Sequence, residues 1–201
     1  MKENNWFDPF YIQSHLNEEE SNIQKNVRDF CNNELKPTVV ERNRKNEFDQ
    51  SLYPKFGSLG VLGQTVKTHG GSGTSNLAYG LVAYEFEKID SSYRSSISVQ
   101  SSLVIHPINE FGSQEQKDKY LPPLIKGEKI GCFGLTESEA GSDPTSMKTS
   151  FKKTKDGYII NGSKNWITNA PIADIFIIWA IEENKDHKLS LIHISEPTRP
   201  M

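Results

Sequence analysis

Cysteine is scarce in this sequence of 201 residues, where only Cys31 and Cys132 occur. The two lie far apart, and neither belongs to a CxxC pair. Small secreted domains held by disulfides need a dense framework of cysteines, and structural zinc sites use paired cysteines. The scarcity therefore excludes both classes and fits a reducing compartment.

Long apolar runs and an excess of one charge are also missing. The longest apolar stretch, around residues 175–181, is about half of what a bilayer span needs. Lys and Arg number 23 against 26 Asp and Glu, so no basic field argues for nucleic acid. The start, MKENNWFDPFYIQ, resembles neither a signal peptide nor an Arg-rich transit peptide. We expect no nucleic-acid or membrane partner, and a bacterial cytoplasmic protein, or a mitochondrial matrix protein if the chain is a processed eukaryotic form.

Motifs for metal catalysis and for nucleotide-binding loops are absent as well. The five histidines are scattered and show no HExxH spacing. Neither the GxSxG pattern nor a P-loop occurs, and the glycines near residue 70 do not form GxGxxG. The sequence gives no support for a metal site or for Rossmann or P-loop nucleotide binding.

The first 128 residues have the pattern of helices. Asn17 can cap a helix whose first turn is acidic and whose apolar side chains recur at three- and four-residue steps up to Leu35. Two later helical runs are expected, one from Leu77 to Ile89 and one ending at Pro107. A last run starts with a capping-box pattern at Ser113 and is expected to close at Pro122-Pro123.

From residue 129 the pattern changes to strands, in IGCFGLTE, SFKKTK, YIINGSKNWIT and IFIIWA. Asp156-Gly157 between two of these runs predicts a hairpin. IFIIWA lacks alternation and predicts a strand covered on both faces. We therefore expect an α+β fold, with a boundary near residue 128 between a helical part and a β part.

Three stretches are candidates for chemistry. Residues 131–144, GCFGLTESEAGSDP, can present backbone N–H groups and hydroxyls to a polar ligand, or form a long capped turn. Trp166, beside Thr168 and Asn169, can cover a flat aromatic ligand, or be a core tryptophan at a strand end. Arg94, set among serines, suits a carboxylate or phosphate, or is a solvated surface charge.

Three segments together resemble the acyl-CoA dehydrogenase family: FGLTESEAGSD at 133–143, GSKNWITNAPIAD at 162–174 and GSQEQKDKYLPPLIKGE at 112–128. Within the family, LAYGLVAYEFEKIDSSYRSSISVQSSLVIHPI and NAPIADIFIIWA are most similar to glutaryl-CoA dehydrogenases, where an arginine follows Asp-Ser-x-Tyr. The resemblance implies a helical domain over residues 1–128, a small, β-barrel-like domain over residues 129–188 that is truncated here, and a carboxy-terminal four-helix bundle that is missing here.

The resemblance also implies where FAD and an acyl-CoA substrate bind. Arg94 and Ser95 would hold the distal carboxylate of a glutaryl chain, and Ser142 would contact the acyl-CoA. A guanidinium in the acyl pocket selects for a charged chain, because burying an unpaired carboxylate is costly. The residues implied to bind the flavin are Phe133, Leu135, Thr136, Gly141, Ser142, Trp166, Ile167 and Thr168.

The implied reaction removes an α-proton from glutaryl-CoA, transfers a hydride from the β-carbon to flavin N5 and releases carbon dioxide, giving crotonyl-CoA. Electrons would pass to an electron-transfer flavoprotein, and the family's full-length members are expected to be homotetramers. The family's base is a glutamate of the missing bundle, so no catalytic residue is expected in this chain.

The last residues, 189–201, do not resemble the family's continuation, and we expect them to be an atypical tail from a truncated or artefactually joined reading frame. Two alternatives to a glutaryl-CoA dehydrogenase stay open. One is a catalytically incomplete fragment that binds flavin weakly or not at all. The other is a dehydrogenase of an uncharged short-chain acyl-CoA.

Overall fold

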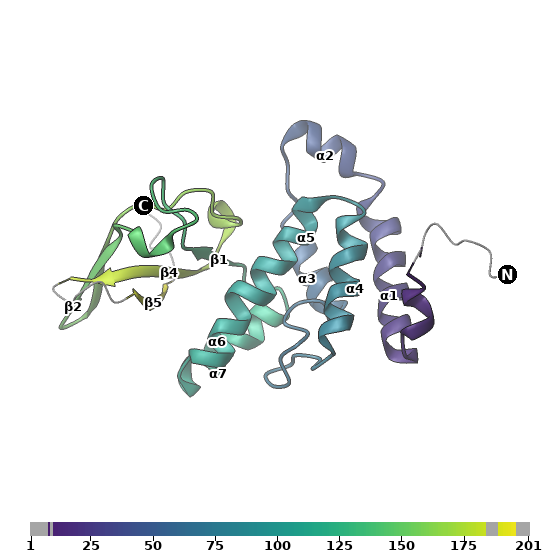
Figure 1. Cartoon of the computed structure of the whole chain (residues 1–201), viewed down its shortest axis with the longest axis horizontal. Coiled ribbons are helices and arrows are strands. Elements are labelled where there is room, and N and C mark those ends of the chain that lie inside the picture. Colours follow the sequence, from purple (N-terminus) through teal and green to yellow (C-terminus); the bar gives the residue numbers. More distant parts are fainter. Residues whose placement is uncertain (1–7, 9, 184–188, 196–201) are drawn as a thin grey trace.

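The computed structural model describes residue 8, residues 10–183 and residues 189–195, the last without side chains. A helical part is followed along the chain by a smaller sheet part, joined at β1 (Figure 1). This order confirms the predicted α+β fold. The helical part contains η1 Ile12–His15, α1 Glu18–Phe30, η2 Cys31–Leu35, α2 Val39–Lys45, α3 Leu52–Ser58, α4 Asn76–Glu87, α5 Ser91–Ser98, η3 Val99–Ile105, α6 His106–Phe111 and α7 Gln114–Ile125, and the sheet part adds the short helices η4 Pro144–Ser146 and η5 Ala170–Ile172.

Two helices begin with the capping boxes that the sequence predicts. In α1, the Glu20 backbone N–H donates to Asn17 Oδ1 at 2.8 Å, and the Asn17 N–H donates back to Glu20 Oε2 at 3.2 Å. In α7, Ser113 and Gln116 make the same reciprocal pair. Each box satisfies backbone N–H groups that have no partner within the helix.

Prolines that we expected to end helices lie inside them instead. α5, the π-helical η3 and α6 form one rod, and Pro107 lies in the first turn of α6. Pro122 and Pro123 lie in the last turns of α7, which ends at Ile125. A proline near a helix end removes few backbone hydrogen bonds, and here buried leucines flank the pair on both sides. Packing therefore outweighs the local signal.

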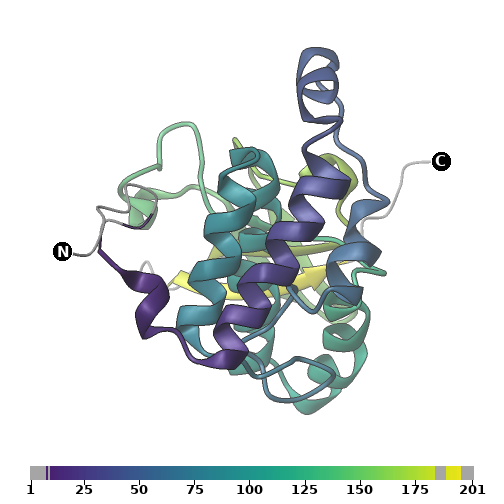
Figure 2. The same cartoon turned by 90° about the vertical axis from the view of Figure 1, so that its right-hand side faces the viewer.

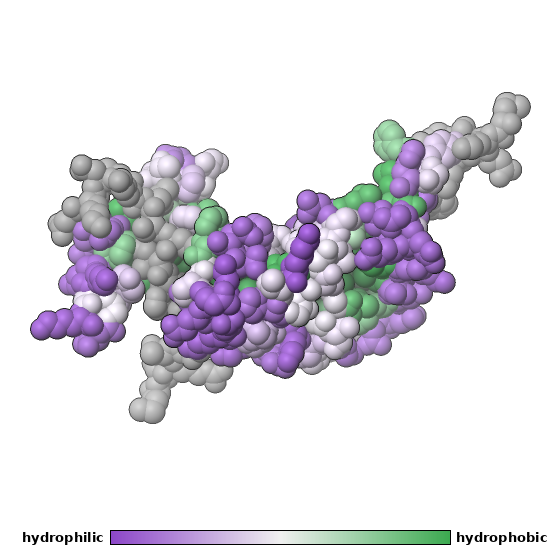
Figure 3. Space-filling model, turned by 90° about the horizontal axis from the view of Figure 1, so that it is seen from below, coloured by the Kyte–Doolittle hydropathy of each residue, from purple (hydrophilic) through white to green (hydrophobic). Residues whose placement is uncertain are grey.

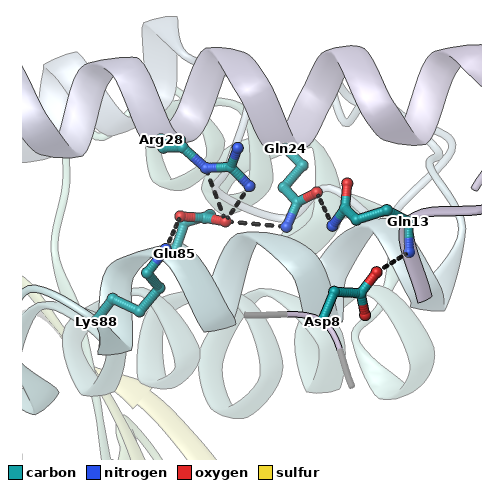
Figure 4. Close-up of polar contacts among 6 residues, drawn as sticks. All are labelled: Asp8, Gln13, Gln24, Arg28, Glu85 and Lys88. Carbon is teal, nitrogen blue, oxygen red and sulfur yellow. Dashed lines mark hydrogen bonds and ion pairs between the residues drawn. The ribbon is translucent and has the colours of Figure 1, made fainter. Parts of the chain in front are cut away.

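α1 and α4 lie side by side (Figure 2) and enclose a buried carboxylate. Glu85 exposes only 2% of its side chain and accepts hydrogen bonds from Arg28 at 2.9 Å, from Gln24 at 2.9 Å and from Lys88 at 3.2 Å (Figure 4). Burial raises the pKa of Glu85, but Arg28 and Lys88 outweigh it and leave that pKa below its ordinary value. The ion cluster thus fastens the two helices.

The sheet is arranged around its central strand. Its strands are β1 Gly131–Gly134, β2 Ser150–Thr154, β3 Gly157–Asn161, β4 Ile175–Glu182 and β5 Leu189–Ser195. β4 pairs in parallel with β1 and with β2, and antiparallel with β5. β2 and β3 form the hairpin predicted at Asp156-Gly157.

Two features of the sheet differ from expectation. In β4, Ile175 and Ile177 are buried, while Phe176 and Ile178, which alternate with them along the strand, are half-buried, so one face is covered more completely than the other. The backbone of residues 189–195, which we expected to belong to an atypical tail, pairs with β4 as β5. This antiparallel pairing extends the sheet past residue 188. Residues 196–201 of that expected tail lie outside the described residues.

The surface is mixed in character. Figure 3 shows one face, where hydrophilic side chains dominate and hydrophobic ones gather in smaller patches. Within the described part of the chain, no helix is both long and apolar enough to cross a membrane.

Candidate functional site

Trp166 combines full exposure with an unusual backbone conformation. Its residue is 94% exposed, and its φ of 59° lies in the left-handed region, as does the φ of 69° at Asn169. Such conformations are uncommon for residues other than glycine and persist where the surroundings hold them, often at ligand-binding sites. A large exposed aromatic in this setting is therefore a candidate ligand contact, and the alternative of a core tryptophan is wrong.

The turn that carries Trp166 is tied to the strand β1 and to the loop that follows it. Asn165 N–H donates to the Thr136 carbonyl at 2.9 Å, and Asn169 Nδ2 donates to the Gly131 carbonyl at 3.2 Å. These contacts bring residues 166–168 beside the stretch 133–136. The exposed indole thus projects from a fixed backbone.

A buried ion pair anchors the loop after β1. Glu137 Oε1 lies 2.8 Å from Lys164 Nζ, and the two side chains are only 8% and 10% exposed. Glu137 also accepts from the backbone N–H of Lys148 at 2.7 Å and of Thr149 at 3.0 Å. Lys164 in turn donates to the Leu135 carbonyl at 2.9 Å. The carboxylate therefore joins both ends of the loop to the segment that leads into Trp166.

These contacts set the protonation state of Glu137. Burial would raise the pKa of its carboxyl, but the hydrogen bonds from the Lys148 backbone and from Lys164 outweigh burial and lower that pKa to about 2. Sequence analysis missed both members of the pair, because residues 27 positions apart in separate segments give no local signal. The one hint in the sequence is that Glu137 and Lys164 are charged residues within the stretches 131–144 and 162–174, which the sequence analysis names.

The other loop candidates are exposed and accessible. Gly141 and Ser142 follow the bridge between Glu137 and Ala140, and an added Cβ at Gly141 would meet nothing within 4 Å. Among the described residues, the hydroxyls of Ser142 and Thr136 have no hydrogen-bond partner. A polar hollow of about 280 Å³ lies nearby and is lined by Glu137, Ser138, Glu139, Lys148, Thr149, Gly162 and Ser163.

Arg94 and Ser95 lie on α5, in the helical part. Arg94 Nε donates to Glu87 Oε2 at 2.8 Å, and the two side chains are 39% and 47% exposed. Glu87 belongs to α4, so sequence analysis did not connect it with Arg94. Within the described part of the chain, no hydrogen bond joins Arg94 or Ser95 to Trp166. Hydrogen bonds therefore do not connect the candidate substrate-binding residues with the candidate flavin-binding residues.

Comparison with known proteins gives a consistent result. The family model "Acyl-CoA dehydrogenase, N-terminal domain" matches residues 17–128, and "Acyl-CoA dehydrogenase, middle domain" matches residues 132–199. A short-chain specific acyl-CoA dehydrogenase of Clostridium acetobutylicum is 40% identical over 84% of this chain and 45% of its own. The mitochondrial isovaleryl-CoA dehydrogenase of Bos taurus is 40% identical over 82% of this chain and 39% of its own.

A solved structure agrees. The crystal structure of a glutaryl-CoA dehydrogenase from Mycobacterium smegmatis in complex with FADH2 has a TM-score of 0.85 and 40% identity, over 87% of this chain and 45% of that one. The chain thus spans less than half the length of these relatives. Because the first model alone matches more than half of its residues, the chain belongs to the acyl-CoA dehydrogenase family.

Proposed function

We propose that this chain contributes the flavin-covering and acyl-recognising residues of an FAD-dependent dehydrogenase of glutaryl-CoA. The observation that carries the flavin part is Trp166, whose exposed indole projects from a turn fixed against β1. The observation that carries the substrate part is the oriented guanidinium of Arg94. We also propose an electron-transfer flavoprotein as electron acceptor and a homotetramer as the full-length assembly.

The described residues fit a flat, polar-edged cofactor. Trp166 offers an apolar face of the right shape, and the Thr136 hydroxyl, without a partner among the described residues, offers a hydrogen bond at the edge. When bound, FAD would supply the two-electron oxidant. We assign Phe133, Leu135, Thr136, Gly141 and Ser142 to one side of the cofactor and Trp166, Ile167 and Thr168 to the other.

The ion pair of Arg94 with Glu87 supports recognition of a dicarboxylyl chain. Glu87 contacts only Nε, so the pair of terminal nitrogens can form a bidentate contact with a second carboxylate. The Glu87 contact also fixes the plane of the guanidinium before substrate arrives. Ser95 is adjacent and half-buried, and we assign its hydroxyl to the same carboxylate.

A second candidate is a dehydrogenase of an uncharged short-chain acyl-CoA. Glu87 already gives Arg94 a carboxylate partner, so an uncharged acyl end would not leave the guanidinium unpaired. The two candidates make opposite predictions for Arg94. We assign no catalytic base in this chain.

The test compares the affinities of the FAD-loaded chain for glutaryl-CoA and butyryl-CoA by calorimetry. We expect glutaryl-CoA to bind about tenfold more tightly, because a charge-assisted contact is worth about 1.5 to 3 kcal/mol. Arg94→Gln should abolish the preference, while Arg44→Gln, which removes an exposed charge on α2, should preserve it. An equal affinity of the unchanged chain for both ligands favours the uncharged substrate.

A further inference from the structure

Two side chains that are far apart in the sequence hold one residue of β1 by hydrogen bonds. The Gly131 backbone N–H donates to Gln100 Oε1 at 2.8 Å, and the Gly131 carbonyl accepts from Asn169 Nδ2 at 3.2 Å. Gln100 belongs to η3 in the helical part, and Asn169 belongs to the turn that carries Trp166. Gly131 is therefore the point at which the helical rod and the Trp166 turn meet.

Gln100 is fixed from all sides. It is fully buried, and its Nε2 donates to the Leu124 carbonyl at 3.0 Å and to the Lys129 carbonyl at 2.9 Å. Its amide thus makes hydrogen bonds to three backbone groups, at the end of α7, in the connection and at the start of β1. A buried amide with every partner in place is rigid, because loss of any partner leaves a buried polar group unsatisfied.

Gly131 packs against the same π-helical segment without any spare room. A Cβ added at Gly131 would lie 2.4 Å from Cγ1 of Val104, which is far closer than two carbons approach. Val104 lies one turn after Gln100 on η3. Steric contact and the Gln100 hydrogen bond therefore set the position of β1 on the rod together.

The rod is continuous from η3 back into α5, which carries Arg94. We propose that Gln100 is a positioning residue, which acts through Gly131 and Asn169 to hold the Trp166 turn at a fixed position relative to Arg94. This inference rests on the proposed function, because it is the flavin face and the acyl-recognition group that are held in register. Gln100 itself touches neither ligand.

The test compares Gln100→Met with Ser101→Ala in the full chain. Ser101 is the next residue of η3, is also buried, and accepts from the Gly63 N–H at 3.1 Å, so its loss affects the same helix but a different neighbour. Hydrogen exchange is measured at the amides of Asn165 and Ala170, which belong to the Trp166 turn and donate to the carbonyls of Thr136 and Ile167 rather than to Gln100. Gln100→Met should speed their exchange about fivefold or more, and Ser101→Ala should not. Equal effects of the two variants overturn the proposal.

A second readout separates positioning from general destabilisation. FAD dissociation constants are measured for Gln100→Met, Asn169→Ala and the double variant. If Gln100 acts through Gly131 and Asn169, the double variant should bind FAD about as weakly as whichever single variant binds FAD less tightly. Losses of FAD binding free energy that add up in the double variant contradict the proposal. If Gln100→Met does not fold, Asn169→Ala must by itself speed exchange at Asn165 and Ala170, and unchanged exchange overturns the proposal.

Failure of the proposed function gives a different pattern. If the unchanged chain binds no FAD, the flavin assignment fails, while the exchange comparison still decides whether Gln100 holds the Trp166 turn. If the unchanged chain binds FAD but Gln100→Met does not change hydrogen exchange in the Trp166 turn, the positioning role of Gln100 fails while the proposed function stands.

Discussion

Glu137 and Lys164 form a buried ion pair, with 2.8 Å between Oε1 and Nζ, that fastens the loop after β1 to the segment leading into Trp166. Both stretches of the candidate flavin site therefore depend on one charge pair. Both side chains of the pair are shielded from solvent, whereas Trp166 is exposed.

The depressed pKa of Glu137 makes stability depend on pH. Its ionised form is favoured in the folded chain, so its contribution is fully present above its ordinary pKa of 4.5 and is lost as pH falls toward about 2. This contribution is on the order of 3 kcal/mol. Glu137→Gln should therefore lower the free energy of unfolding at pH 7, and the difference from the unchanged chain should shrink below pH ~4.5 in urea titrations. A difference that is constant with pH would contradict the assignment.

The Glu85 cluster predicts unequal effects of its two cations. Arg28→Met should destabilise the chain by about 3 kcal/mol, because it leaves a buried carboxylate without its principal partner. Lys88→Met should cost less, since its ammonium lies at 3.2 Å, farther than the guanidinium at 2.9 Å, and its side chain is half-exposed. Denaturant unfolding of both variants measures the difference, and equal losses would show that the cluster has no dominant cation.

In Arg28→Met, the contribution of Glu85 to the free energy of unfolding should also depend on pH in the opposite direction. Burial is the largest influence on the pKa of Glu85 and raises it, and Arg28 is the strongest opposing contact. Without Arg28 the pKa should rise above its ordinary value, so the cost of the buried charge falls as pH drops and the carboxyl is protonated. The stability gap to the unchanged chain should narrow on acidification. A widening gap would count against burial as the governing influence.

Both cysteines should be unreactive while the chain is folded. Burial raises the pKa of Cys31 and of Cys132 to about 12, so almost no thiolate is present at pH 7. A thiol reagent should label neither residue in the native chain and both in denaturant, as followed by mass spectrometry. Rapid labelling of either residue under native conditions would show that its burial is transient.

Local signals predicted much of the fold. The capping boxes at Asn17 and Ser113 and the hairpin at Asp156-Gly157 involve residues close in sequence, whose backbone chemistry acts locally. The prediction that a helix ends at Pro107 was wrong, because packing holds the helical rod around this proline and no local sequence pattern indicates that packing.

The candidate site was predictable only by residue type. The residues around Trp166 predict an indole that covers a flat ligand, which stays a prediction, and its left-handed backbone and its ties to β1 depend on contacts distant in sequence. The pairs of Glu137 with Lys164 and of Gln100 with Gly131 join residues 27 and 31 positions apart, and only the fold brings them together.

The most direct test of the account is FAD binding by this chain with and without the Trp166 indole. Titration of FAD, followed by flavin fluorescence, should show saturable binding that Trp166→Leu weakens about tenfold, because stacking on the indole is lost. Tyr158→Leu removes another exposed aromatic, on β3, and should leave the affinity unchanged. Equal affinities of the unchanged chain and Trp166→Leu, or no saturable binding at all, would contradict the proposal that this turn covers the flavin.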